Sequence, residues 1–160
     1  MDKAQIYQSF LNEMTNVYND AVKAAEDAHA TATHTESTAE NKYDTFGLES
    51  AYLAHGQSQR VLQYQSDLLS LNNLNLPNLD ASSSIIQGAL VVIEDQNQVE
   101  KIVLLGPVAG GLTVSIEGKN ISMVSISSPL GQKLLGSFEG DSIAVAIGSD
   151  LKVYDIVAVS

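Results

Sequence analysis

The first part of the chain repeats its apolar residues at the spacing of a helix that faces another helix. These residues alternate steps of three and four, which is the heptad pattern of a coiled coil. The positions are Tyr7, Phe10, Met14, Val17, Ala21, Ala24 and Ala28. The pattern predicts a helix over about residues 3–30, and its short alanine side chains predict a close approach of the partner helix toward the end.

A second helical pattern covers about residues 39–73, with a less apolar seam. Its predicted seam positions are Leu48, Ala51, His55, Ser58, Leu62, Gln65 and Leu69. Between the two patterns, residues 31–38 are rich in Thr and Ser, whose side chains bond to local backbone and weaken a helix. We therefore predict an antiparallel helical hairpin over residues 1–76, with its tip at about 31–38.

The pattern of residue types changes after Pro77. Residues 77–84 combine this proline with Asn, Asp and Ser, which is typical of a linker. Beyond it, short β-branched runs are separated by glycine turns, and these runs predict strands. The runs are residues 89–94, 99–105, 112–117, 121–127, 142–147 and 151–159.

One short helix is expected among these strands. Ser128 is a good N-cap, Pro129 suits the first helical position, and Gly136 suits a helix end. The chain is thus predicted to be an α+β protein, in which a coiled-coil hairpin precedes a small antiparallel β domain over residues 85–160.

The charge and composition narrow the classes of function. Eight basic and 19 acidic residues give a net charge of −11, so autonomous binding of DNA through its phosphates is not expected. The absence of cysteine excludes disulfides and thiolate metal sites. No apolar run reaches the ~20 residues of a membrane helix, and the first residues do not form a secretory signal. We expect a cytoplasmic protein that does not contact a membrane.

Few residues of this sequence are arranged as in the active site of a self-contained enzyme. Residues 106–111 are glycine-rich, but Leu112 stands where a phosphate-binding loop has lysine. His29 and His34 are five residues apart, which does not match the i,i+4 spacing of metal-binding helices. We therefore expect no catalytic pocket and no resident cofactor.

Acidic residues gather instead at the predicted tip. Glu36, Glu40 and Asp44 follow each other at intervals of four, so they share one face wherever the segment is helical. One interpretation is that these acids complement the positive end of a helix. The other is that they meet a cation or a basic partner, and because two or three carboxylates cannot hold Mg²⁺ alone, such an ion would be shared.

Two stretches resemble a known family. Residues 121–136 contain Ser128-Pro129-Leu130-Gly131 and Leu134-Leu135-Gly136, and Glu139-Gly140-Asp141 and Tyr154-Asp155-Ile156-Val157 follow. This series resembles the signature of the Gre transcript-cleavage factors of bacterial RNA polymerase. At the predicted tip, Glu40-Asn41-Lys42-Tyr43 is similar to the family's Glu-Asn-Ala-Glu-Tyr.

The resemblance implies both a fold and a function. It implies an FKBP-like C-terminal domain that docks at the rim of the polymerase secondary channel through Ser127, Ser128, Pro129 and Gly131. It further implies that the coiled coil enters the channel, where Glu36, Glu40 and Asp44 stimulate cleavage of backtracked RNA. Glu40 and Asp44 would be ligands of a Mg²⁺ ion shared with the polymerase. The chain would act in trans as a monomer and would not itself be an enzyme.

The chain departs from the family at two points. The family has an aspartate three residues before the tip glutamate, where this chain has Ser37; either Glu36 or the pair of Glu40 and Asp44 would then supply the acids. Family members that grip RNA have a basic hairpin face, whereas the hairpin here is acidic. We therefore expect only indirect contact with the RNA 3′ end.

Three other functions stay open. The first is a secondary-channel regulator that inhibits or modulates polymerase without stimulating cleavage, which the Ser37 departure favours. The second is a peptidyl-prolyl isomerase, for which the C-terminal part has few aromatic residues to line a pocket. The third is a plain coiled-coil interaction protein, for which the heptads alone suffice.

Overall fold

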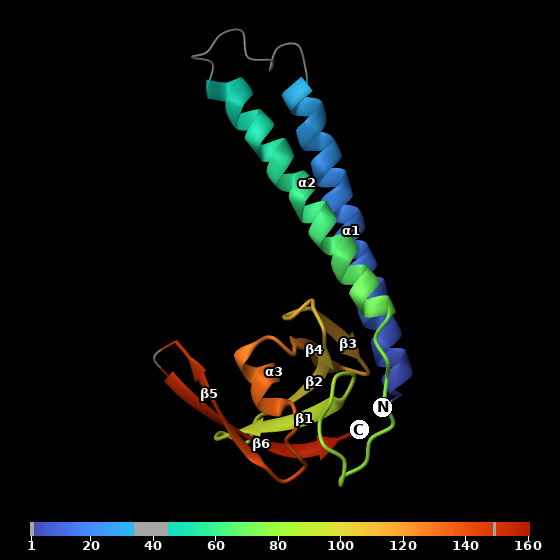
Figure 1. Cartoon of the computed structure of the whole chain (residues 1–160), viewed down its shortest axis with the longest axis vertical. Coiled ribbons are helices and arrows are strands. Elements are labelled where there is room, and N and C mark those ends of the chain that lie inside the picture. The colour runs from blue at the N-terminus through green and yellow to red at the C-terminus, as the bar shows by residue number, and fades with distance from the viewer. Residues whose placement is uncertain (1, 34–44, 149) are drawn as a thin grey trace. The chain divides into compact units, whose positions relative to one another are not determined.

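The computed structural model describes residues 2–33, 45–148 and 150–160. The chain divides into two compact units, one of Met14–Leu69 and one that joins Met1–Glu13 with Ser70–Ser160. The described residues of the first unit are helical, and the second unit contains the sheet (Figure 1). The observed elements confirm the predicted α+β class, while the likeness to the FKBP fold stays a prediction.

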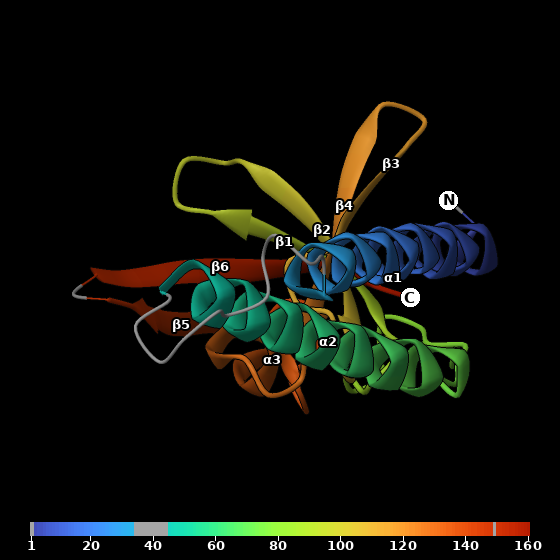
Figure 2. The same cartoon turned by 90° about the horizontal axis from the view of Figure 1, so that it is seen from above.

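Two long helices form the hairpin. Helix α1 spans Lys3–Thr33 and helix α2 spans Thr45–Asn72, and they lie side by side in both views (Figures 1 and 2). Helix α1 begins after Asp2, whose carboxylate accepts a hydrogen bond from the backbone N–H of Ala4 at 2.9 Å. The predicted helices are confirmed where they are described. The predicted tip falls largely on residues 34–44, which lie outside the described residues.

Helix α1 continues a few residues beyond its predicted end. The hydroxyl of Thr31 donates to the carbonyl of Asp27 at 3.0 Å, and that of Thr33 donates to the carbonyl of His29 at 2.9 Å. Both bonds follow the i→i−4 direction of the helix, so these threonine hydroxyls bond within the helix and do not turn the backbone away from it.

The helices bury one face each, and the face of α2 differs from the predicted one. In α1, Phe10, Met14, Ala21 and Ala28 of the predicted seam are buried. In α2, however, Leu48, Leu62 and Leu69 of the predicted seam are 52%, 57% and 62% exposed. Buried or half-buried residues occur instead at the positions one residue earlier, and Asp67 is buried beside them. These earlier positions are Gly47, Ser50, Ala54, Gln57, Val61, Tyr64, Leu68 and Leu71.

The wrong seam has a simple cause. Helix α2 has apolar residues at two adjacent heptad positions, since Val61 precedes Leu62 and Leu68 precedes Leu69. Periodicity within α2 is satisfied by either position, so the choice depends on which face meets α1.

The second unit includes the base of the hairpin. Ile6, Phe10 and Leu71 are fully buried. The hydroxyl of Tyr7 donates to the carbonyl of Leu71, and the ammonium of Lys3 donates to the carbonyl of Pro77. Burial raises the pKa of Tyr7 and lowers the pKa of Lys3. These contacts tie the start of α1 to the last turn of α2 and to the segment that follows it.

Six strands form one sheet in the order β3-β4-β2-β1-β6-β5. Their bounds are β1 Leu90–Asp95, β2 Glu100–Gly106, β3 Thr113–Ile116, β4 Lys119–Ser125, β5 Ser142–Ile147 and β6 Asp150–Val159. Each overlaps its predicted run. In the β3–β4 hairpin Ile116 pairs with Lys119, and the two turn residues Glu117 and Gly118 have φ of 52° and 77°, as a type I′ turn requires.

One pairing departs from the antiparallel sheet that we predicted. Strands β2 and β4 are parallel, whereas the other pairings among the described strands are antiparallel. After β2 the chain passes one strand position through residues 107–112, so β3 takes the edge and β4 returns between β3 and β2. A sequence pattern predicts where strands occur along the chain, but it does not predict their order in the sheet.

Helix α3, Pro129–Leu134, packs on the sheet and contacts both β4 and β5, which are separated by three strands in the sheet order. Its Leu134 joins a buried cluster with Val91, Ile93, Val103 and Ile156 from the strands. Because these strand residues alternate with residues of the other face, the cluster lies on one side of the sheet. The predicted short helix is confirmed, and its position sets the site described below.

The register of the α2 seam can be tested with two alanines. Ala54 is buried and Ala51 is exposed. We expect Ala54→Asp to lower the free energy of unfolding by about 2 kcal/mol or more, since it places an unpaired charge between the helices. Ala51→Asp should change it by less than about 0.5 kcal/mol. Urea unfolding followed by circular dichroism measures both changes. A larger loss for Ala51→Asp than for Ala54→Asp would support the seam predicted from the sequence.

Candidate functional site

The predicted acidic tip lies outside the described residues. Glu36, Glu40 and Asp44 all fall within residues 34–44, between the end of α1 at Thr33 and the start of α2 at Thr45. Within the ranges that the structure covers, no three His, Asp or Glu side chains gather so that they could hold a metal ion. The predicted Mg²⁺ ligands Glu40 and Asp44 therefore stay a prediction.

The second predicted site, Ser127 to Gly131, forms the corner between β4 and α3. Ser128 is the N-cap of α3, since its hydroxyl accepts from the backbone N–H of Gly131 at 3.1 Å. The same hydroxyl donates to the carbonyl of Ser125 at 2.7 Å. Pro129 occupies the first helical turn, where the missing N–H of proline has no cost.

Gly131 is required by its surroundings. It is buried, and a Cβ atom at this position would lie 2.0 Å from the carbonyl oxygen of Ser125. Any side chain would therefore push α3 away from the end of β4. Gly131 and Ser128 hold the corner together, and neither presents a side chain freely to a partner.

Ser127 and Pro129, in contrast, are exposed. The backbone of Ser127 is held by two side chains: its N–H donates to the hydroxyl of Ser125 at 3.2 Å, and its carbonyl accepts from the amide of Gln132 at 3.3 Å. The structure thus divides the four predicted residues into two that shape the corner and two that face outward.

The corner borders a groove that sequence reasoning did not include. The groove has a volume of about 370 Å³ and lies between α3 and β5; it is lined by Ser128, Pro129, Leu130, Val145, Ala146 and Gly148. The β5 residues are separated from Pro129 by more than a dozen positions, so no local pattern connects them. The uncharged run of β5 was the only signal available in the sequence.

Two other polar clusters in this unit are turn structures. The pKa of Asp80 is lowered by hydrogen bonds from the hydroxyls of Ser82 and Ser83. The pKa of Asp95 is lowered mainly by backbone N–H bonds from Asn97 and Val99, and Lys101 approaches its carboxylate at 4.0 Å. Both carboxylates close a local turn, so neither points to a ligand.

Among the described residues, no helix combines the length and apolar character needed to cross a lipid bilayer.

This chain is similar in sequence to several known proteins. No protein-family model matches it. A protein named transcription elongation factor GreA from Xanthomonas axonopodis pv. citri is 29% identical over 101 residues, which are 63% of this chain and 61% of that protein. The protein of the same name from Ralstonia nicotianae is 28% identical over 100 residues, which are 62% and 60% of the two chains. The match spans about three fifths of these relatives.

Solved structures of two proteins with related names also align with this chain. The transcription factor Gfh1 aligns over 94% of this chain and 93% of its own, with a TM-score of 0.41 and 19% identity. The elongation factor GreA/GreB from Nitrosomonas europaea aligns over 71% and 92%, with a TM-score of 0.36 and 20% identity. The sequence matches to proteins named transcription elongation factor GreA confirm the resemblance described above: over about three fifths of its length the chain is similar to members of the Gre family.

Proposed function

We propose that this chain is a transcription elongation factor that binds bacterial RNA polymerase through the secondary channel and stimulates cleavage of backtracked RNA. The observation that carries the proposal is the sequence match to proteins named transcription elongation factor GreA. The long antiparallel helices and the separate β unit are consistent with a protein that brings side chains to another protein's active centre.

The corner before α3 would be the docking surface at the channel rim. Ser127 and Pro129 are exposed at this corner, while Ser128 and Gly131 hold the backbone in place. The hydroxyl of Ser127 forms a hydrogen bond with that of Ser125 at 2.8 Å, so the ring of Pro129 is the side chain most available to a partner. The neighbouring groove between α3 and β5 offers space for an apolar side chain of the polymerase. A rigid corner lowers the entropy that is lost when the surface binds.

The tip acids would act inside the channel. Carboxylate oxygens are the ligands that Mg²⁺ prefers, and two or three of them leave its coordination incomplete, so Glu40 and Asp44 would share the ion with the polymerase. When bound, such an ion activates water and stabilises the leaving oxygen of a phosphodiester. Glu36, Glu40 and Asp44 would accept hydrogen bonds from the attacking water and orient it, and the chain would have no catalytic activity by itself.

A second candidate function is favoured by one residue. Ser37 stands where the Gre tip has an aspartate, so the usual pair of acids is incomplete. A tip that enters the channel without a functional pair of acidic side chains would slow elongation and leave the RNA uncleaved. Both functions share the partner and differ in the RNA product.

Cleavage is tested on a halted, backtracked elongation complex. We expect the purified chain to release a short 3′ RNA fragment, and Glu40→Ala to abolish the release because a carboxylate is lost. The matched control is Glu26→Ala, which removes an exposed acid from α1 outside the tip and should leave cleavage unchanged. Slower elongation with intact RNA would instead support the inhibitory function.

Docking is tested by binding of the full chain to polymerase core enzyme. We expect Pro129→Ala to weaken binding by about fivefold to thirtyfold, since truncation of a residue that contributes strongly to an interface costs about 1–2 kcal/mol. Its melting temperature should stay the same because the ring is exposed. Gly131→Ala should lower both affinity and melting temperature, since its Cβ meets the carbonyl of Ser125 at 2.0 Å.

The control for docking is Val99→Ala, which shortens an exposed apolar side chain between β1 and β2. Equal affinity of Pro129→Ala and Val99→Ala would show that the corner at α3 does not contact the polymerase.

A further inference from the structure

A groove runs along one side of the helical unit, between α1 and α2. One section has a volume of about 370 Å³ and is lined by Ala24, Asp27, Ala28, Thr31, Ser50, Leu53 and Gln57. The next section has a volume of about 260 Å³ and is lined by Val17, Asp20, Ala21, Ala24, Gln57, Arg60 and Tyr64. Because the two sections share Ala24 and Gln57, they form one continuous groove.

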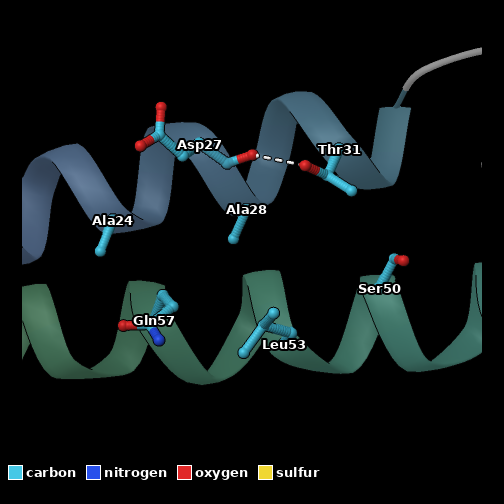
Figure 3. Close-up of a pocket in the computed structure, with 7 residues that line it drawn as sticks. All are labelled: Ala24, Asp27, Ala28, Thr31, Ser50, Leu53 and Gln57. Carbon is cyan, nitrogen blue, oxygen red and sulfur yellow. Dashed lines mark hydrogen bonds between the residues drawn. The ribbon is translucent and has the colours of Figure 1, made fainter.

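The groove exists because the seam is made of small side chains. Figure 3 shows Ala24 and Ala28 directed toward α2, with Leu53 and Gln57 opposite them. Because methyl groups are short, they leave space beside the line of contact between the two helices, and this space forms the groove. Leu53 remains 57% exposed beside this floor, and its apolar surface has no cover in the described structure.

Negative charge lies along the α1 side of the groove. Asp20 and Asp27 are seven residues apart, so they lie on the same side of α1 at a separation of roughly 10.5 Å along its axis. Within the described ranges neither carboxylate forms an ion pair. Figure 3 shows the carboxylate of Asp27 on the side of α1 that faces away from α2, so a partner would have to reach it across α1. Arg60 lies on the opposite side, on α2.

This charge pattern selects the occupant. Acids at heptad spacing beside an apolar seam are the positions that pair with basic residues of a neighbouring helix in a coiled coil. A second copy of this chain is disfavoured, because its net charge is −11 and its own acids would repel Asp20 and Asp27. The matching partner is a helix with small or apolar residues toward the groove and lysine or arginine toward α1.

We propose that the groove formed by residues 17–31 of α1 and 50–64 of α2 binds a basic amphipathic helix of a partner protein. The bound helix completes a three-helix bundle with α1 and α2. Its lysines or arginines, seven residues apart, pair with Asp20 and Asp27, and its small side chains cover the alanine floor and Leu53. This proposal does not depend on binding to polymerase.

The groove on the other side of the hairpin serves as an internal control. It is lined by Val22, Ala25, Glu26, His29, Ser58, Val61 and Leu62. Glu26 is adjacent to Asp27, and Ala25 is adjacent to Ala24, so the same substitution can be made on either side of one helix.

The test is a selection of displayed helical peptides against the full chain. The peptides are about 20 residues long, which exceeds the roughly 12–15 residues below which isolated helices are marginal. They carry alanine or leucine on one face and either lysine or glutamate at two positions seven residues apart. We expect lysine to be enriched over glutamate by about threefold to tenfold, because each exposed ion pair contributes little.

The variants locate the binding surface. In the double variant Asp20→Lys and Asp27→Lys the preference should change to glutamate, whereas Glu26→Lys should keep the preference for lysine. Ala24→Leu fills the shared part of the groove and should abolish enrichment, while Ala25→Leu should retain it. Circular dichroism checks that each variant remains helical.

Several outcomes overturn the proposal. They are the absence of any enriched helix, enrichment without a charge preference, a preference that the double variant does not reverse, and equal loss of binding in Ala24→Leu and Ala25→Leu.

Discussion

The contact between α1 and α2 determines which side chains of the hairpin are available for function. One face of each helix is buried because contact between the helices removes its apolar side chains from water. Burial of Met14, Ala21 and Ala28 on α1 and of Ala54 on α2 places the α2 seam one residue earlier than its apolar periodicity suggested. Leu48, Leu62 and Leu69 are consequently exposed, and the small residues at the interface leave grooves along its sides.

In the β unit, hydrogen bonds to the backbone and a glycine shape the exposed corner before α3. At the end of β4 the backbone turns into α3 through hydrogen bonds of the Ser128 hydroxyl, and the absence of a side chain at Gly131 lets the helix approach the carbonyl of Ser125. Leu134 then anchors α3 in the core. Because these residues provide the rigidity, Ser127 and Pro129 can be exposed without loss of local structure. The residues of this corner therefore fall into two groups: Ser128 and Gly131 fix its shape, and Ser127 and Pro129 are exposed.

The proposed function assigns separate tasks to the two kinds of structure. The β unit would recognise the polymerase, and the hairpin would carry the acids of residues 36–44 to it. Neither task needs an enclosed pocket, which agrees with the open grooves found in the described residues. The acidic hairpin disfavours contact with RNA phosphates and favours basic protein surfaces, so the proposed helix-binding groove and the proposed polymerase contact draw on the same excess of negative charge.

Local patterns in the sequence determined the elements: the two long helices, six strands, the α3 corner with its cap at Ser128, and the resemblance to the Gre family. These features depend on residues that are close along the chain, which a pattern can show. The α2 seam, the parallel pairing of β2 with β4, and the meeting of Pro129 with Val145 depend on contacts between distant segments. Only the tertiary structure decided them, because several arrangements satisfy the same local periodicity and packing alone distinguishes between them.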